Sequence, residues 1–393
     1  MHAPPLSLYI HIPWCVRKCP YCDFNSHAQQ GHLPVDAYIR ALLADLDRDL
    51  AEAGPASTRR PLVSIFFGGG TPSLFAPDAV ARILDGVRER LDVEDGAEIT
   101  LETNPGTVEH GRFDGYLAAG VNRLSFGVQS FDDDMLARLG RIHSAMEAER
   151  AVKSAQDAGY TNINIDLMYA LPRQSPAGAL ADVERTIALQ PTHVSHYQLT
   201  LEPNTVFAAR PPPLPDEDSA WDMQEACQAR LAEAGYMQYE VSAYAAPGRR
   251  CAHNLNYWEF GDYIGIGAGA HGKLSDATSG EIVRSAKVKV PQSYLARADQ
   301  GATFGTRQRI DPAERPFEFM LNALRLVEGV PSELFPARTG VAEQVAAPVL
   351  ARQRDRGWLE ADPARIRPTA LGRRFLNDLM ADWLPDDPAR KAR

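Results

Sequence analysis

Residues 9–24 of the chain read Tyr9-Ile10-His11-Ile12-Pro13-Trp14-Cys15-Val16-Arg17-Lys18-Cys19-Pro20-Tyr21-Cys22-Asp23-Phe24. Three of the five cysteines of the chain lie here, with the spacing C-x3-C-x2-C. The alternating apolar run from Leu6 to Ile12 is typical of a β-strand, so we expect the cysteines on the loop that follows a first strand. Such a loop can surround a small inorganic centre with three thiolates.

The cysteine spacing favours an iron–sulfur cluster over a zinc ion. A four-iron cube normally takes four thiolates, so three cysteines leave one iron open for a small chelating ligand. A structural zinc ion needs a closed set of four ligands, and no second C-x-x-C follows. His11 or His27 would complete such a set, which keeps zinc open as the alternative. A disulfide is less favoured, because the cysteines number five and nothing suggests export.

Length and composition are those of an ordinary globular protein. The 393 residues suffice for two or three domains, or for one large barrel with a small domain. The net charge of −10 argues against a general nucleic-acid binder. Neither a signal peptide nor an apolar stretch of the roughly 20 residues that span a membrane is recognisable, so we expect a cytoplasmic protein. The sequence leaves open peripheral contact with a membrane and a homodimer.

Strand and helix patterns alternate through roughly the first 200 residues. Six short apolar strands are each followed by a segment with apolar residues at helical spacing, and parallel strands joined by crossover helices follow from this order. We predict an α/β fold, a partial (β/α)6 TIM-like barrel, in preference to a doubly wound sheet. The predicted strands cover residues 6–12, 62–67, 97–102, 123–128, 162–167 and 193–201.

Two connectors divide the rest of the chain, one Pro-rich over residues 203–219 and one over residues 301–316. We therefore expect a barrel over 1–203, a barrel extension over 204–300 and a mostly helical C-terminal cap domain over 301–393. The expected order of two helices, two short strands and a last helix in that domain is winged-helix-like. The alternative, which we favour, is a plain cap that buries one face of the barrel.

Polar or Gly-rich residues follow every one of the first five predicted strands. The chemistry of a βα barrel lies at the carboxyl ends of its strands. After the cysteines of the first strand, the next four strands end in Gly68-Gly69-Gly70-Thr71-Pro72, Glu102-Thr103-Asn104-Pro105, Gly127-Val128-Gln129-Ser130 and Asp166. Loops are generally polar and rich in glycine, which explains any one of these sets. It does not explain five such sets after five successive strands.

These residue types suit a zwitterionic ligand that carries a ribose. Glu102 and Asp166 can accept hydrogen bonds from an ammonium group or a ribose hydroxyl, and Gln129 can donate and accept them. Arg141 offers a planar fork for a carboxylate, with a surface ion pair as the alternative. The glycine run 68–70 lets backbone come close to a ligand with free N–H and C=O groups.

The cysteine motif after a first strand, with Tyr21 before its last cysteine, resembles the cluster motif of the radical S-adenosylmethionine (radical SAM) enzymes. Residues 9–15 more narrowly resemble the branch that holds oxygen-independent coproporphyrinogen III dehydrogenase (HemN) and the HemW haem chaperones. The resemblance implies a radical SAM barrel and a [4Fe–4S] cluster on Cys15, Cys19 and Cys22. The residues that it assigns to SAM are Tyr9, Tyr21, Gly69, Gly70, Thr71, Glu102, Gln129, Arg141 and Asp166.

Two departures from the dehydrogenase pattern favour the chaperone side of this branch. The dehydrogenases carry a further cysteine two positions after the third cluster cysteine, where this chain has Phe24. They also have a longer N-terminal extension, whereas eight residues precede Tyr9 here. Coproporphyrinogen dehydrogenase activity is therefore not expected, and a radical SAM oxidoreductase of that kind is the alternative.

Residues 251–258 contain His253-Asn254-Leu255-Asn256-Tyr257-Trp258, which resembles the H-N-x-x-Y-W signature that HemW proteins associate with haem binding. The resemblance implies haem contact by His253 as iron ligand and by the rings of Tyr257 and Trp258, with Arg249 and Arg250 near the propionates. The alternative is a loop histidine hydrogen-bonded to backbone beside two packed aromatic rings.

A glycine-rich run over residues 265–272 ends near His271, a second candidate haem ligand. The run does not fit G-x-G-x-x-G, so we interpret it as tight backbone packing near the cofactor rather than a dinucleotide loop. From the resemblance as a whole we expect a haem chaperone whose partners are haem and acceptor haemoproteins. Whether SAM is cleaved during haem transfer stays open.

Overall fold

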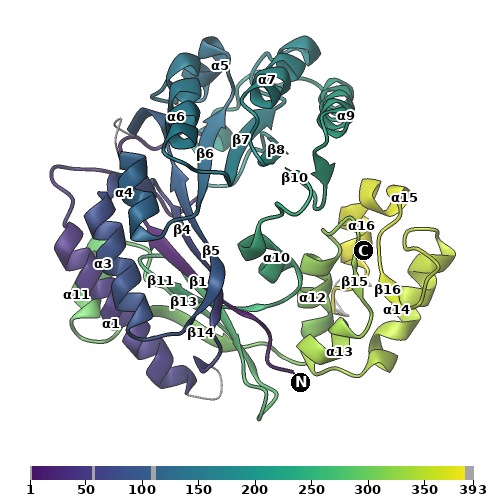
Figure 1. Cartoon of the computed structure of the whole chain (residues 1–393). Coiled ribbons are helices and arrows are strands. Elements are labelled where there is room, and N and C mark those ends of the chain that lie inside the picture. The colour runs from purple at the N-terminus through teal and green to yellow at the C-terminus, as the bar shows by residue number, and fades with distance from the viewer. Residues whose placement is uncertain (1, 55–57, 108–111, 386–393) are drawn as a thin grey trace.

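One twelve-stranded sheet organises the chain, which a computed structural model describes over residues 2–54, 58–107 and 112–385 (Figure 1). Its strands follow the order β14-β13-β12-β11-β1-β4-β5-β6-β7-β8-β10-β9. The last eight residues of the predicted cap domain lie outside the described part of the chain.

Six parallel strands form the centre of the sheet, so the predicted βα repeats are confirmed. They are β1 (Leu6–Ile12), β4 (Leu62–Gly69), β5 (Val93–Thr103), β6 (Arg123–Gln129), β7 (Ile163–Tyr169) and β8 (His193–Gln198). The helices between and after them are α1 (Val35–Ala53), α3 (Pro77–Arg88), α4 (Arg112–Ala119), α5 (Asp133–Arg138), α6 (Ala145–Asp157), α7 (Pro176–Ala188) and α9 (Glu217–Glu233). Short 3-10 turns cover Pro72–Leu74 and Pro105–Thr107.

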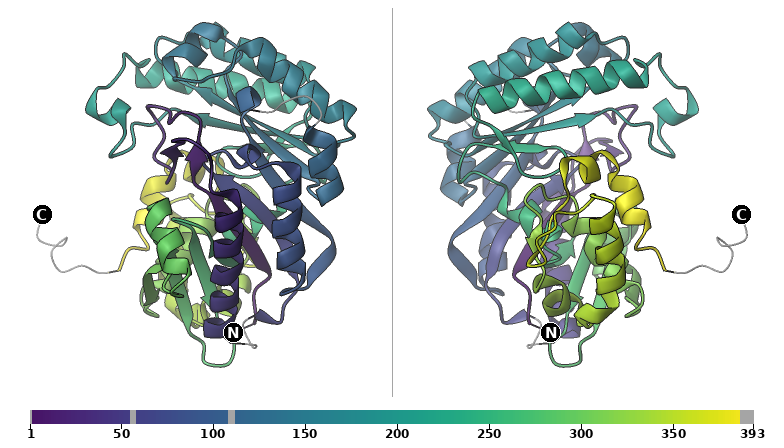
Figure 2. Two further views of the ribbon diagram at one scale, coloured as in Figure 1. Left: turned by 90° about the vertical axis from the view of Figure 1, so that its left-hand side faces the viewer. Right: turned by 90° about the vertical axis from the view of Figure 1, so that its right-hand side faces the viewer.

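Strand alternation gives the sheet an apolar outer face and a largely polar inner face. In β1, Leu6, Leu8 and Ile10 are fully buried in the core that also contains side chains of α1 and α3. Successive residues of a strand point to opposite faces, so Ser7 and Tyr9 point into the barrel. Figure 2 shows the helices lying along the outside of the sheet. The inner face is therefore free to carry chemistry.

Both ends of the sheet are extended beyond the six repeats. β11 (Asp262–Ile266) pairs in parallel with β1, and β12 (His271–Ser275), β13 (Ile282–Lys287) and β14 (Phe304–Arg309) continue antiparallel, with α11 (Pro291–Ala298) between β13 and β14. β10 (Ala243–Ala245) and β9 (Met237–Gln238) extend the edge at β8. The prediction of a connector over 301–316 is wrong, because β14 lies inside it.

The HNxxYW residues form helix α10 (Ala252–Trp258), whereas the alternative to haem contact placed His253 on a loop. Seven residues are too few for a helix that is stable by itself, so contacts with the sheet must stabilise it. Asn256 supplies one such contact, since its Nδ2 donates to Ser7 Oγ and to the Asp262 carbonyl, at 2.9 Å each. The helix thus lies on the inner face of the sheet.

A second buried core joins the C-terminal residues to the sheet extension. It contains Phe319 and Leu350 from the C-terminal helices and Phe260 and Ile282 from the extension. The elements are α12 (Arg315–Ala323), β15 (Val330–Pro331), α13 (Leu334–Thr339), α14 (Glu343–Asp355), β16 (Arg365–Ile366), α15 (Ala370–Arg374) and α16 (Leu376–Ala381). Figure 1 places them beside α10, across the sheet from α1 and α3. Within the described residues, no helix is both long and apolar enough to cross a membrane.

Candidate functional site

A cavity of about 470 Å³ lies at the carboxyl ends of the parallel strands. Its volume falls within the range of roughly 300–1,000 Å³ that small-molecule sites occupy. The cavity brings together most of the residues that the sequence analysis selected. Those that line it are Cys15, Cys19, Tyr21, Cys22, Gly69, Gly70, Thr71, Glu102, Gln129, Arg141 and Asp166.

The loop with the three cysteines is held in shape by its own backbone. β2 (Trp14–Cys15) pairs with β3 (His27–Ala28), which closes the loop at its base. The Lys18 ammonium donates to the carbonyls of Phe24 and Ser26, at 3.0 and 3.1 Å. The loop is thus ordered by contacts that do not use the thiols.

All three thiols of this loop are free and partly exposed toward the cavity. Burial raises the pKa of Cys15, while Arg141 donates to Cys19 Sγ at 3.6 Å. In the described parts of the chain no three His, Cys, Asp or Glu side chains are close enough to share one metal ion. A cube does not need such convergence, because each thiolate binds a different iron.

The glycine run corrects one expectation, because its N–H groups are not free. Gly69 N–H donates to Glu102 Oε2 at 3.3 Å, Gly70 N–H to the Ile12 carbonyl at 2.8 Å, and Thr71 N–H to the Trp14 carbonyl at 2.7 Å. A Cβ at Gly69 would overlap the His11 ring, and one at Gly70 would overlap the Trp14 carbonyl. The glycines therefore let β4 pass close to the cysteine loop.

Two buried carboxyl groups, those of Glu102 and Asp166, line the cavity. Burial, followed by repulsion from Asp166, raises the pKa of Glu102 to about 8. Burial also raises the pKa of Asp166, whose Oδ1 accepts from Asn164 Nδ2 at 2.7 Å. A cation between the two would favour their charged forms. The residues present thus fit the ammonium and sulfonium groups of SAM.

Sequence reasoning missed the residues of this cavity that lie on β8, which include Ser195 and Tyr197. The Tyr197 hydroxyl donates to Gln129 Oε1 at 2.7 Å. Gln129 itself has a left-handed backbone with φ 76°, next to a shift of register in the pairing of β6 with β7. The alternation of side chains along the sixth predicted strand could have identified both residues, since their side chains point to the face of the sheet that carries Asp166.

Tyr9 is the one predicted SAM residue that does not line this cavity. It lies deeper, on a smaller cavity of about 230 Å³ that shares Glu102 and Asp166 with the first. Its hydroxyl is 3.0 Å from His11 Nδ1. The tyrosine thus lies below the carboxylates rather than at the mouth of the barrel.

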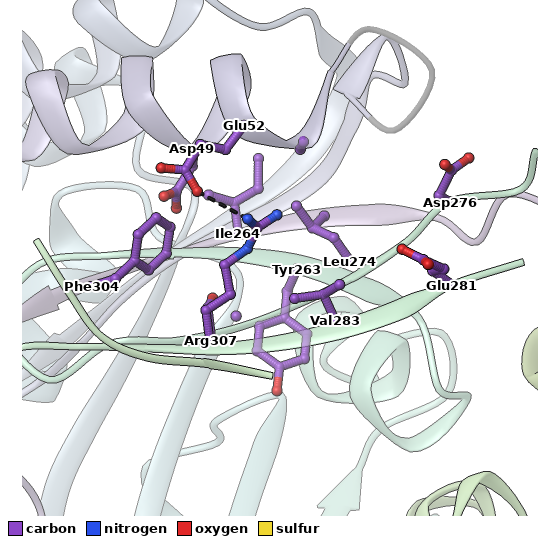
Figure 3. Close-up of a pocket in the computed structure, with 13 residues that line it drawn as sticks. Asp49, Glu52, Tyr263, Ile264, Leu274, Asp276, Glu281, Val283, Phe304 and Arg307 are labelled. Atoms are coloured by element: carbon purple, nitrogen blue, oxygen red, sulfur yellow. Dashed lines mark ion pairs between the residues drawn. The ribbon is translucent and has the colours of Figure 1, made fainter. Parts of the chain in front are cut away.

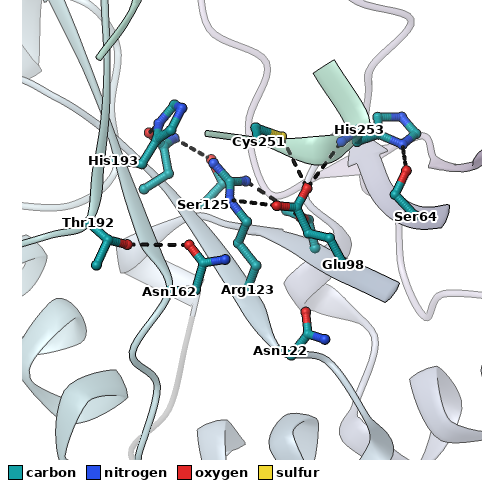
Figure 4. Close-up of polar contacts among 12 residues, drawn as sticks. Ser64, Glu98, Asn122, Arg123, Ser125, Asn162, Thr192, His193, Cys251 and His253 are labelled. Carbon is teal, nitrogen blue, oxygen red and sulfur yellow. Dashed lines mark hydrogen bonds and ion pairs between the residues drawn. The ribbon is translucent and has the colours of Figure 1, made fainter. Parts of the chain in front are cut away.

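A buried polar network surrounds this deeper cavity (Figure 4). Glu98 Oε1 accepts from Cys251 Sγ at 3.3 Å and from His253 N–H at 3.2 Å, and Glu98 Oε2 lies 3.8 Å from Arg123 Nε. Cys251 is fully buried. It is therefore a partner of Glu98 and not an accessible ligand.

His253 lies in this network with both ring nitrogens engaged. Nδ1 is 2.9 Å from Ser64 Oγ and Nε2 is 2.8 Å from the Tyr257 hydroxyl. The ring is 1% exposed and stacks on Phe66 at 4.9 Å between centroids, and burial lowers its pKa to about 3. The alternative to haem ligation was a packed histidine that is hydrogen-bonded to backbone. In the structure His253 is packed and hydrogen-bonded, but it lies on a helix and its ring partners are side chains.

The other predicted haem contacts point in different directions. Tyr257 lines the deeper cavity, one helical turn from His253. Trp258 packs against the C-terminal core instead, with the Arg325 guanidinium 4.3 Å from its ring. Arg250 forms an ion pair with Glu328 at 3.0 Å. The structure does not bring these side chains to one accessible surface.

A hollow on the outer side of the sheet contains none of the predicted residues (Figure 3). It measures about 140 Å³ and lies between α1 and strands β11–β14. Carboxylates of Asp49, Glu52 and Glu281 line it, and Arg307 pairs with Glu52 at 3.2 Å. We therefore place the functional site at the strand ends.

Comparisons with known proteins identify relatives of the chain. Residues 9–185 match the radical SAM superfamily, and residues 310–375 match the HemN C-terminal domain. Two similar curated proteins are both named heme chaperone HemW. The one from Escherichia coli is 51% identical over 98% of this chain and 99% of its own length, and the one from Haemophilus influenzae is 49% identical over the same shares.

A solved structure matches almost the whole fold. It is coproporphyrinogen III oxidase (HemN) from Escherichia coli, with a TM-score of 0.80, 24% identity, and coverage of 97% of this chain and 90% of that one. At this identity the match concerns the fold. The predicted barrel with its C-terminal helical domain is thereby confirmed.

Proposed function

Since the chain belongs to the family of heme chaperone HemW, within the radical SAM superfamily, we propose that it binds haem and delivers it to acceptor haemoproteins. The observation that carries this proposal is the identity of 49% and 51%, over 98% of the chain, to proteins named heme chaperone HemW. The alternative, a radical SAM oxidoreductase such as coproporphyrinogen III dehydrogenase, is less favoured.

In this proposal Cys15, Cys19 and Cys22 hold a [4Fe–4S] cluster, which the superfamily favours over the zinc alternative. The three thiols face one cavity from one ordered loop. When bound, such a cluster supplies the electron for reductive cleavage of SAM. Arg141, buried between Cys19 and the Gly127 carbonyl, balances the negative charge of the thiolates.

SAM would occupy the cavity beside that loop. Glu102 and Asp166 would face its cationic groups, and the carbonyl groups of the glycine run would accept from its ammonium. Tyr21 would lie against the adenine, and Gln129, fixed by Tyr197, would bind a polar group of the ligand. Because Tyr9 lies deeper, we propose for it a supporting role below Glu102.

The experiment combines three measurements on the chain purified without air. Cluster reconstitution should give about four irons per chain; zinc in their place would refute the cluster. Haem titration should give a saturable Soret band, and its absence would refute the chaperone. Coproporphyrinogen with SAM and reductant should give no protoporphyrinogen, whereas turnover would favour the dehydrogenase.

Delivery is tested separately with haem-loaded chain and the apo form of a b-type haemoprotein. The acceptor spectrum should appear faster than haem is lost to a scavenger protein that does not contact the chain. Equal rates would mean passive release of haem and would contradict delivery.

A further inference from the structure

The deeper cavity, the one of about 230 Å³, has walls that the larger cavity at the strand ends lacks. Both cavities share Glu102 and Asp166, but the side chains that line only the deeper one include those of Tyr9, Phe66, Arg123, His253, Asn254 and Tyr257. Its volume equals that of about seven water molecules at about 30 Å³ each. The chemistry of these walls indicates what the space can bind.

Arg123, on β6, presents hydrogen-bond donors to the deeper cavity (Figure 4). The side chain is 2% exposed, and in the part of the chain that the structure describes its Nε has no hydrogen-bond partner. Nη1 reaches Thr100 Oγ1 only at 3.5 Å, and Glu98 Oε2 lies 3.8 Å from Nε, beyond hydrogen-bond distance. A buried guanidinium is costly when its donors are unpaired, so this group calls for an acceptor inside the cavity.

Two further donors line the same cavity. The side chain of Asn254, on α10, forms no hydrogen bond within the described residues. Ser125 Oγ accepts from Asn164 Nδ2 at 2.8 Å, which leaves the hydroxyl proton of Ser125 for another acceptor. A guanidinium, an amide and a hydroxyl together match a carboxylate, which has only acceptors and can take two parallel N–H bonds from an arginine.

The carboxyl groups of Glu102 and Asp166 do not exclude an anion from this cavity. Burial, followed by repulsion from Asp166, raises the pKa of Glu102 to about 8, so this group is mostly protonated at neutral pH. Burial also raises the pKa of Asp166, whose Oδ1 accepts from Asn164. Since burial lowers the pKa of His253 to about 3, Arg123 is the cation among the residues that line the cavity. The anionic end of a ligand therefore belongs at Arg123.

Aromatic rings supply the apolar part of the lining. Phe66 stacks on His253 at 4.9 Å between centroids, and Tyr9 stacks on Phe66 at 6.3 Å. Tyr9 and Phe66 are only partly buried, and both line the cavity. Such ring faces favour an offset stack with another flat ring. The ligand that fits these walls is therefore a flat ring that carries a carboxylate.

We propose that the deeper cavity is a binding site for a small aromatic carboxylic acid, whose carboxylate lies on Arg123 and Asn254. The ring of the acid lies against Tyr9 and Phe66. The site goes beyond the proposed function. At about 230 Å³ it is smaller than the roughly 300–1,000 Å³ of sites for drug-sized ligands, so it does not hold a porphyrin.

The test is a calorimetric titration of the full-length chain with benzoate and two matched probes. Benzoate should bind with a Kd below about 1 mM, which a ligand of its size can reach. Benzamide has the same shape without the charge and should bind about tenfold more weakly. Cyclohexanecarboxylate keeps the charge without the flat ring and should bind several-fold more weakly. Equal affinities for benzoate and benzamide would refute the carboxylate contact.

Variants then locate the probe. Asn254→Ala leaves the pair of Arg123 with Glu98 intact and should weaken benzoate about tenfold, because a hydrogen bond to a charged group is lost. Arg123→Lys keeps the charge but not the planar fork, and should also weaken benzoate at least tenfold. Asn322→Ala is the matched control and should bind like the wild type, since this amide donates to the Glu318 carbonyl in the C-terminal core. Thermal denaturation shows whether each variant is folded, and Asn254→Ala carries the test if Arg123→Lys is not.

A competition experiment separates this site from the proposed function. The haem-loaded chain should bind benzoate with the same Kd as the haem-free chain, and displacement by haem would overturn the proposal. Absence of benzoate binding to the wild type, or an unchanged Kd in Asn254→Ala, would overturn it as well. The titration needs neither haem nor cluster, so a chain that binds benzoate but no haem would refute the chaperone function alone.

Discussion

With SAM in the strand-end cavity as proposed, the raised pKa of Glu102 should make SAM affinity dependent on pH, and one substitution should remove this dependence. The carboxyl is buried beside Asp166 and has a pKa of about 8. A cationic ligand binds the ionised form of Glu102, so a protonated Glu102 must lose its proton before SAM can bind. About one-tenth of the Glu102 side chains are ionised at pH 7 and about nine-tenths at pH 9, a change of about tenfold, or ~1.4 kcal/mol.

The assay is calorimetric titration of SAM into the cluster-loaded chain without reductant, so that SAM is not cleaved. The α-ammonium of SAM itself titrates in this range, near pH 8. The measured quantity is therefore the ratio of the Kd of Glu102→Gln to that of the wild type at each pH. Glutamine is isosteric and keeps an acceptor for the Gly69 N–H, which makes the variant a matched control.

We expect this ratio to rise about tenfold between pH 7 and pH 9, because only the wild type gains a negative charge. The sign follows from the raised pKa: acid weakens binding by the wild type, and base restores it. A ratio that stays constant over this range would mean that Glu102 does not face the cationic part of the ligand. That result would refute the assignment of SAM to this cavity.

Three further predictions concern folding. His253→Ala should lower the free energy of unfolding by about 2–4 kcal/mol in thermal or urea denaturation, because it removes a buried ring with two hydrogen bonds; an unchanged stability would contradict the packing role. Gly69→Ala should lower the free energy of unfolding by about 1–3 kcal/mol, since its Cβ overlaps the His11 ring at a positive φ. The same variant should contain less iron after reconstitution, and a normal iron content would contradict the close packing of β4 against the cysteine loop. Lys287→Met should cost about 3–5 kcal/mol in urea unfolding, because two buried carboxylates lose their partner; Arg309→Met, an exposed pair, should cost under about 1 kcal/mol.

The repeating part of the fold was predictable from sequence because its strands are apolar on their outer face. Burial under helices requires that pattern, so the apolar residues identify β1 and the five parallel strands that follow it. The antiparallel strands β12 and β13, which lie between β11 and β14, lack this pattern. β12 and β13 carry Lys273 and Lys287, which are 2% exposed and paired with Asp262 and Asp45.

Those pairs join residues 11 and 242 positions apart, so no local pattern contains them. A buried lysine looks like a surface lysine until its carboxylate partner is known. For the same reason no local pattern indicates that the HNxxYW residues form a helix. The short helix α10 exists because Asn256 and His253 are hydrogen-bonded to β1 and β4.

The cysteine spacing and the polar residues after each strand predicted, from sequence alone, that three thiols and a set of polar side chains meet at the strand ends, and these side chains line one cavity there. Parallel strands bring their carboxyl ends together whatever their length, so order along the chain was enough. Only the tertiary structure decided which side chains can be reached. It placed Tyr9 and His253 in the barrel and left His271 at the surface, because exposure depends on which distant segments pack over a residue.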